Sequence, residues 1–144
     1  MPAPLAALAK RASRSPELDA AFGGAKTLAV PVPARAPVIA AMAQSRPGRL
    51  LIATATEREA EALVDDLSLF LDPEGPVAPA LLPAWETLPF ERVSPDLATM
   101  ASRALVGDAW RSGGGPAVVV ASARSLLQRL APPSRGERGE GCGH

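Results

Sequence analysis

Short apolar runs alternate with helical segments along most of this chain, and this alternation constrains the fold more than any other feature. The apolar runs, which we predict to be strands, are residues 28–32, 49–54, 77–82 and 117–121. Helical segments separate or follow them at residues 36–44, from Thr56 onward, from Ser94 to about Arg111, and after Ser122. Strands joined by helices favour right-handed crossovers and a parallel sheet. The sequence therefore predicts an α/β fold, an open and mostly parallel four-stranded sheet with helices on both faces.

Local signals predict where three of these helices begin. Thr56 and Glu59 fit a capping box, in which each side chain bonds a backbone N–H at the start of the helix. Ser94-Pro95-Asp96 supplies a cap, a proline at the first helical position and an acid near the positive end of the helix dipole. Ser122 is predicted to cap the last helix.

Length and composition favour one domain. The chain has 144 residues, which suits a single core. Aromatic residues make up only 3% of it, so we expect a core of Ala, Val and Leu. We divide the chain into an N-terminal helical lead-in (1–21), an α/β domain (22–131) and a disordered tail (132–144) rich in Gly, Arg and Glu. The tail differs so much from the rest that we expect a truncated or frameshifted reading frame.

Charge and cysteine content exclude several classes of protein. The formal net charge is zero, so the whole chain does not attract nucleic acid electrostatically. A single cysteine, Cys142, rules out an internal disulfide and suits a reducing compartment. No apolar run approaches the ~20 residues that span a bilayer, and no signal peptide is evident. We therefore expect a cytoplasmic protein with no membrane partner.

The segment from Leu82 to Pro95 concentrates aromatic residues and prolines. Prolines at 83, 89 and 95 exclude a regular helix, so we predict a stiff loop that carries Trp85 and Phe90. These rings could stack on nucleic-acid bases. Glu86 and Glu91 oppose phosphate, however, and the favoured interpretation is that the rings pack the loop against the edge of the sheet.

No catalytic, cofactor-binding or metal-binding residue is predicted. A phosphate-binding loop would follow the first predicted strand, but Pro33-Ala34-Arg35-Ala36-Pro37 contains neither glycine nor lysine. Gly23 to Thr27 has the wrong order, because it leads into a strand. Polar side chains do follow the predicted strands, where α/β proteins bind ligands. Four of them are weak candidates for an anion site: Arg35, Thr56, Ser122 and Arg124.

Several pieces of the chain, in this order, resemble a known family. They are Thr54-Ala55-Thr56 with Glu59, the loop residues Trp85, Glu86, Thr87, Leu88, Pro89 and Phe90, the pair Ser94-Pro95 before a helix containing Arg103, and Val118 to Ala121 followed by Leu126-Leu127-Gln128-Arg129. Residues 22–131 resemble the N-terminal module of the transcription-repair coupling factors (Mfd), which is related to the excision-repair helicase subunit UvrB. The resemblance implies part of a helicase-type (RecA-like) fold with a degenerate P-loop.

The resemblance also implies a function. The full-length family uses ATP and magnesium to translocate on DNA, displaces stalled RNA polymerase and recruits excision repair through UvrA, mainly with other domains. This chain would then be a non-catalytic N-terminal fragment without a cofactor of its own, with the rest of the coupling factor as its partner. The loop residues from Trp85 to Pro95 would be structural or would contact that partner. The alternative is a small stand-alone α/β protein that binds an anion or a nucleotide.

Overall fold

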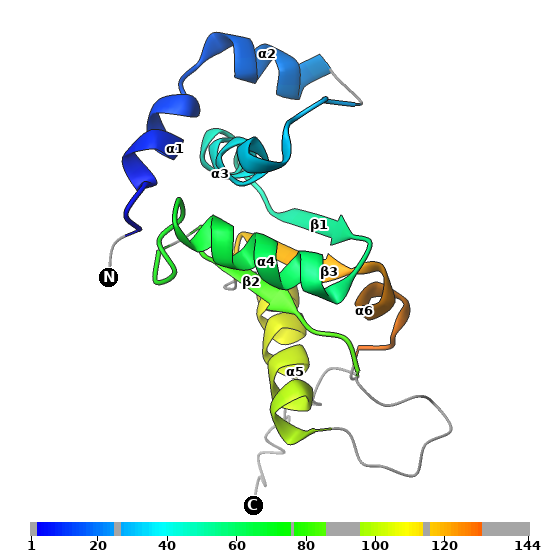
Figure 1. Ribbon diagram of the computed structural model, residues 1–144. Coiled ribbons are helices and arrows are strands. Elements are labelled where there is room, and N and C mark those ends of the chain that lie inside the picture. Colours follow the sequence, from blue (N-terminus) through cyan, green and yellow to red (C-terminus); the bar gives the residue numbers. More distant parts are fainter. Residues whose placement is uncertain (1–2, 25–26, 76, 86–95, 114–115, 131–144) are drawn as a thin grey trace, which may run out of the picture.

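The computed structural model describes residues 3–24, 27–75, 77–85, 96–113 and 116–130. Figure 1 shows three parallel strands with helices packed around them. The strands are β1 (Leu50–Thr54), β2 (Pro79–Leu82) and β3 (Val118–Ser122). The helices are α1 (Ala6–Ala12), α2 (Pro16–Gly24), the 3-10 turn η1 (Val32–Ala34), α3 (Arg35–Ser45), α4 (Glu57–Ser68), α5 (Leu97–Ser112) and α6 (Ala123–Leu127).

Of the three strands in the described residues, the one that comes last in the sequence lies in the middle of the sheet. The order is β1-β3-β2, and β3 pairs in parallel with both neighbours. The chain crosses from β1 to β2 through α4 and returns to the middle through α5. Two right-handed crossovers that run in opposite directions place their helices on opposite faces. The predicted parallel α/β architecture is therefore confirmed.

Side chains of β3 form two hydrophobic clusters, one on each face of the sheet. Val118 and Val120 pack with buried residues of α3 and α4, and α4 lies in front of the strands in Figure 1. Val119 and Ala121 point the other way and pack with Val106 and Trp110 of α5. All five residues of β3 are buried, as expected for a central strand covered on both faces.

Small residues let the N-terminal helices approach the rest of the domain closely. Ala9 of α1 and Ala40 of α3 are fully buried in the same cluster as Leu67 of α4. The N–H of Leu5 donates to the carbonyl oxygen of Leu69 at 2.8 Å, which ties the start of the chain to the end of α4. The buried hydrophobic residues are otherwise Ala, Val and Leu with Phe22, as the composition predicts.

The prediction of a fourth strand at residues 28–32 is wrong. Residues 27–31 have no regular secondary structure, and Val32 already belongs to η1. Pro31 lacks an N–H, and its backbone turns the chain into η1, where the N–H of Ala34 donates to the carbonyl oxygen of Pro31. Leu28 and Val32 are exposed, so the apolar character of this run is not matched by burial among the described residues.

The predicted starts of α4 and α6 are confirmed, whereas α5 starts at Leu97 and not at the predicted first helical position, Pro95. Thr56 and Glu59 form the capping box of α4, and Ser122 caps α6. Helix α4 ends at Ser68. Asp96 precedes α5 without a side-chain cap, and Ser94 and Pro95 lie outside the described residues. So does the tail at 132–144. No helix in the described part of the chain is long and apolar enough to cross a bilayer.

Candidate functional site at the carboxyl edge of the sheet

Three side chains hold the backbone of Pro83, Ala84 and Trp85 where it leaves β2. The carboxylate of Glu57 accepts the N–H of Ala84 at 2.8 Å, and Nη1 of Arg103 donates to the carbonyl oxygen of Pro83. The amide of Gln128 makes two bonds to Trp85, because its Oε1 accepts the N–H at 2.6 Å and its Nε2 donates to the carbonyl oxygen at 3.4 Å. We call Glu57, Arg103 and Gln128 the Trp85 clamp.

Each member of the Trp85 clamp comes from a different helix or helix end. Glu57 is the first residue of α4, Arg103 lies within α5, and Gln128 is the residue that ends α6. These elements are far apart in the sequence but meet at the carboxyl edge of a parallel sheet. The clamp therefore links both crossover helices to the segment that follows β2.

Arg103 is the most buried charged residue of the site, with 2% of its surface exposed. Its Nη2 donates to the carbonyl oxygens of Ser125 and Gln128, both at 3.3 Å. The guanidinium carbon lies 5.2 Å from the centre of the Trp85 ring, a cation–π distance. Burial lowers the pKa of Arg103 from its ordinary value, and the charge of Glu57 opposes that shift. Arginine still remains protonated at neutral pH, so the clamp carries a buried positive charge.

Ser122 and Ser125 form a buried pair beneath the clamp. The hydroxyl of Ser122 donates to Oε2 of Glu57 at 2.6 Å and accepts the N–H of Ser125 at 3.1 Å. The hydroxyl of Ser125 donates to the carbonyl oxygen of Ser122 at 2.9 Å. Both residues are fully buried, so the polar atoms of Ser122 are used inside the protein.

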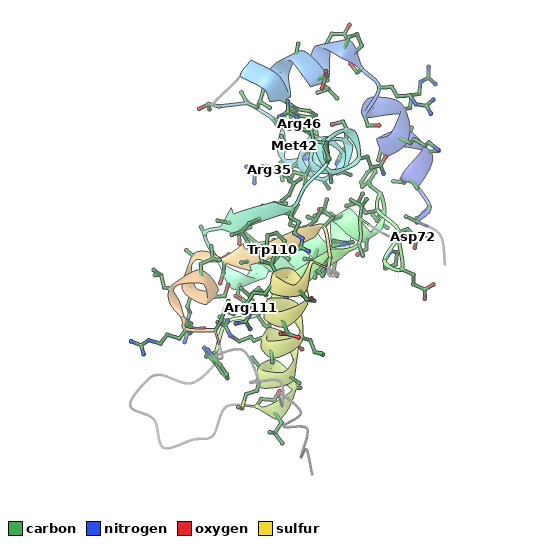
Figure 2. The ribbon with its side chains drawn as sticks, turned by 180° about the vertical axis from the view of Figure 1, so that it is seen from behind. Arg35, Met42, Arg46, Asp72, Trp110 and Arg111 are labelled. Carbon is green, nitrogen blue, oxygen red and sulfur yellow. The ribbon has the colours of Figure 1, made fainter. Side chains whose placement is uncertain are left out.

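The structure brings together only two of the four anion-site candidates. Thr56 and Arg124 line a cavity of about 410 Å³ with Trp85, but Glu57 and Glu61 line the same cavity and oppose an anion. Ser122 is buried beside it. Arg35 lines a separate cavity of about 380 Å³. In Figure 2 it lies with α3, away from Trp110 and Arg111 of α5.

Of the loop residues predicted to carry a structural or interaction role, only Trp85 is described. It is half-buried, and its ring faces Arg103. Glu86, Thr87, Leu88, Pro89, Phe90, Ser94 and Pro95 lie outside the described residues.

Sequence reasoning did not identify the clamp. From the sequence, Arg103 and Gln128 are noted only as residues of the segments that resemble the family, and no role is predicted for Glu57. A signal for Arg103 does exist in α5, where Val106 and Trp110 pack against the sheet and Gly107 is buried. Arg103 precedes Val106 by three residues, Gly107 by four and Trp110 by seven, and it therefore lies on the same face of the helix. A charge on the apolar face of a helix predicts a buried, hydrogen-bonded group.

A second arginine contacts an aromatic ring at the opposite end of the sheet. Arg49, just before β1, places its guanidinium carbon 5.2 Å from the ring centre of Trp110 and donates to the carbonyl oxygen of that residue. This contact ties the end of α5 to the start of β1, and Figure 2 shows Trp110 next to the strands. Within the described residues no group of three or more His, Cys, Asp or Glu side chains could hold a metal ion.

The chain is similar to proteins named transcription-repair-coupling factor. It is 39% identical to those of Mycobacterium bovis and Mycobacterium tuberculosis over 140 residues, which is 90% of this chain and 11% of each relative. It is 37% identical to that of Myxococcus xanthus over 105 residues, which is 69% of this chain and 8% of the relative. The chain thus spans about a tenth of the length of these curated relatives. No family model matches the sequence.

Proposed function

Because this chain belongs to the family of transcription-repair-coupling factors, we propose that it is a non-catalytic, N-terminal structural part of such a factor. In this proposal it is part of a helicase-type domain whose phosphate-binding loop has degenerated. ATP and magnesium would be bound by the rest of the factor, which would also translocate on DNA, displace RNA polymerase and recruit UvrA. The protein would act in the cytoplasm.

The occupied carboxyl edge of the sheet carries this proposal. In open α/β sheets a ligand binds at that edge, and phosphates bind to free N–H groups at helix starts. Here the N–H of Glu59 donates to Thr56, and the N–H groups of Ala55 and Thr56 donate to the carboxylate of Glu59. The chain's own Pro83–Trp85 segment is bound next to them. The N–H groups of Ala55, Thr56 and Glu59 are therefore already used by the chain's own side chains.

The Trp85 clamp supports a structural role for the carboxyl edge of the sheet, because it holds the backbone that follows β2. It binds the backbone on both sides of the Ala84–Trp85 peptide bond and stacks Arg103 on the Trp85 ring. The direction in which the chain leaves β2 is thereby fixed. We propose that this positions the aromatic segment that begins at Trp85 against the rest of the coupling factor.

A nucleotide titration tests the non-catalytic role. We expect the melting temperature of the chain to stay constant when Mg-ATP, Mg-ADP or inorganic phosphate is added up to millimolar concentration. A ligand that binds only the folded state raises the melting temperature in a saturable way. A saturable rise with any of the three would contradict this proposal and favour the stand-alone anion- or nucleotide-binding protein.

A chimeric coupling factor tests the structural role directly. The aligned region of the Mycobacterium tuberculosis relative is replaced by this chain, and repair of the transcribed strand is measured in cells that lack their own factor. We expect the chimera to restore repair and the Gln128→Ala chimera to restore less, because the clamp loses both bonds to Trp85. An Asp65→Ala chimera, changed at an exposed site, is the control. Loss of repair in the chimera that carries the unchanged chain, although it folds and hydrolyses ATP normally, would contradict the proposal.

A further inference from the structure

One peptide group lies between the two charged members of the Trp85 clamp. The carbonyl oxygen of Pro83 accepts a hydrogen bond from Nη1 of Arg103, and the N–H of Ala84 donates to Oε1 of Glu57. The carbonyl and the N–H belong to the same peptide bond, which is trans. The C=O and N–H of a trans peptide point in opposite directions. This peptide group therefore separates the guanidinium of Arg103 from the carboxylate of Glu57.

Arg103 has one N–H group that the clamp does not satisfy. Its Nη1 and Nη2 donate to three carbonyl oxygens, but its Nε is buried and has no hydrogen-bond partner among the described residues. A buried N–H without an acceptor costs free energy, and it costs more when the group is charged. The clamp therefore leaves a charged donor unsatisfied in the interior, where a negatively charged acceptor would be favourable.

Glu57 is the carboxylate placed to serve that donor. Burial lowers the pKa of Arg103, and the charge of Glu57 opposes this shift, so the two side chains attract each other across the peptide group. Oε2 of Glu57 accepts the hydroxyl of Ser122 at 2.6 Å, whereas Oε1 accepts the N–H of Ala84. The cavity of about 410 Å³ borders Glu57, Pro83 and Ala84. This cavity gives the peptide group space into which it can move.

We propose that Glu57 makes the clamp a latch with two states, held and released. In the held state, which the structure describes, Oε1 of Glu57 accepts the N–H of Ala84. In the released state the peptide group between Pro83 and Ala84 moves into the cavity, and Oε1 turns to Nε of Arg103 while Oε2 stays on Ser122. The buried guanidinium then exchanges a neutral carbonyl oxygen for a carboxylate, which is the stronger acceptor.

The latch lets the backbone after β2 leave the clamp while the sheet stays intact. Removing a partner from a buried charge is normally costly, because the charge is left uncompensated. Here the compensating carboxylate of Glu57 is already next to the peptide group that leaves. The segment from Pro83 to Trp85 can therefore exchange between the clamp and solvent. This inference adds a moving part to the structural role proposed above, but it rests on the contacts of the clamp and not on that role.

Hydrogen exchange of the Ala84 N–H, measured by NMR relative to the N–H of Val120 in the central strand, tests the latch. In Glu57→Gln the amide oxygen can still accept the N–H of Ala84, but the neutral side chain cannot form an ion pair with Arg103. We expect the relative exchange of Ala84 to slow by about tenfold, because the released state loses an ion pair while the held state loses only the charge of one hydrogen bond. The matched control is Glu61→Gln, which removes the same charge from the lining of the same cavity and should leave this rate unchanged.

A clamp without a released state predicts a change of the opposite sign. Glu57→Gln would then only weaken the bond to Ala84, and an unchanged or faster relative exchange would overturn the proposal. The wild-type chain supplies a second measurement that does not require a variant to fold. Its Ala84 N–H should exchange at least about tenfold faster than the N–H of Val120, because a local opening needs less free energy than global unfolding. Exchange of both N–H groups with equal protection, set by global unfolding, would also overturn the latch.

Discussion

One residue, Arg103, joins three parts of the chain that are distant in sequence. Its guanidinium donates to the carbonyl oxygens of Pro83, Ser125 and Gln128 and lies over the Trp85 ring. A planar fork with several N–H groups can serve these acceptors at once, whereas a lysine ammonium is compact and cannot stack in the same way. The identity of the residue therefore matters more than its charge.

The substitution Arg103→Lys tests whether the guanidinium group, and not only its positive charge, is required at this position. We expect it to lower the free energy of unfolding by about 2 kcal/mol, because buried carbonyl oxygens lose charged donors worth roughly 1.5–3 kcal/mol each and the lysine replaces only some of them. Urea denaturation measures the change. Arg58→Lys, at an exposed position of α4, is the control and should change stability by less than about 0.5 kcal/mol. Equal stability of the two variants would show that the stacked fork is unimportant.

At the scale of single elements, local signals predicted structure better than apolar character did. The capping box at Thr56 and Glu59 and the cap at Ser122 depend only on residues within one turn, and both were predicted. A strand instead needs a neighbour that the sequence does not reveal. Residues 28–32 are as apolar as β1, but the proline before η1 redirects the chain and no strand pairs with them among the described residues.

The capping box of α4 predicts that Thr56 and Glu59 stabilise the protein jointly and not independently. Thr56→Ala should lower the free energy of unfolding by about 1 kcal/mol, as loss of an N-cap usually does. Glu59→Ala should have a similar effect, because its carboxylate accepts the N–H groups of Ala55 and Thr56. The double variant should lose less than the sum, since residues of one network are not additive. Asp65→Ala, exposed on the same helix, serves as the control in urea denaturation. Strictly additive losses would contradict a reciprocal box.

For the whole molecule, the class of fold could be predicted but its strand order and its site could not. Composition predicted a core of small aliphatic residues, and the alternation of elements predicted a parallel sheet. Which strand lies in the middle depends on long-range pairing of β3 with both others. The Trp85 clamp likewise joins residues 27, 20 and 43 positions apart, which no local pattern encodes.

A core of small residues makes its few large side chains important. Leu67 and Leu71 are the two leucines among the largest fully buried side chains. Leu67→Ala should therefore cost about 2–5 kcal/mol, a large part of the roughly 5–15 kcal/mol that stabilises a typical domain. Leu105→Ala, at a residue 70% exposed on α5, should be nearly neutral. Thermal and urea unfolding compare the two. A small loss at Leu67 would mean that the helices close the cavity by moving together.

The position of β3 has a consequence for synthesis of the protein. Proteins are made from the N-terminus, and domains usually fold as units as they emerge from the ribosome. In this sheet β1 and β2 are not neighbours, because β3 lies between them. A nascent chain that has not yet reached Val118 thus holds two strands with nothing between them to pair with. The sheet, and the clamp that needs Gln128, can assemble only once the last strand and α6 have left the ribosome.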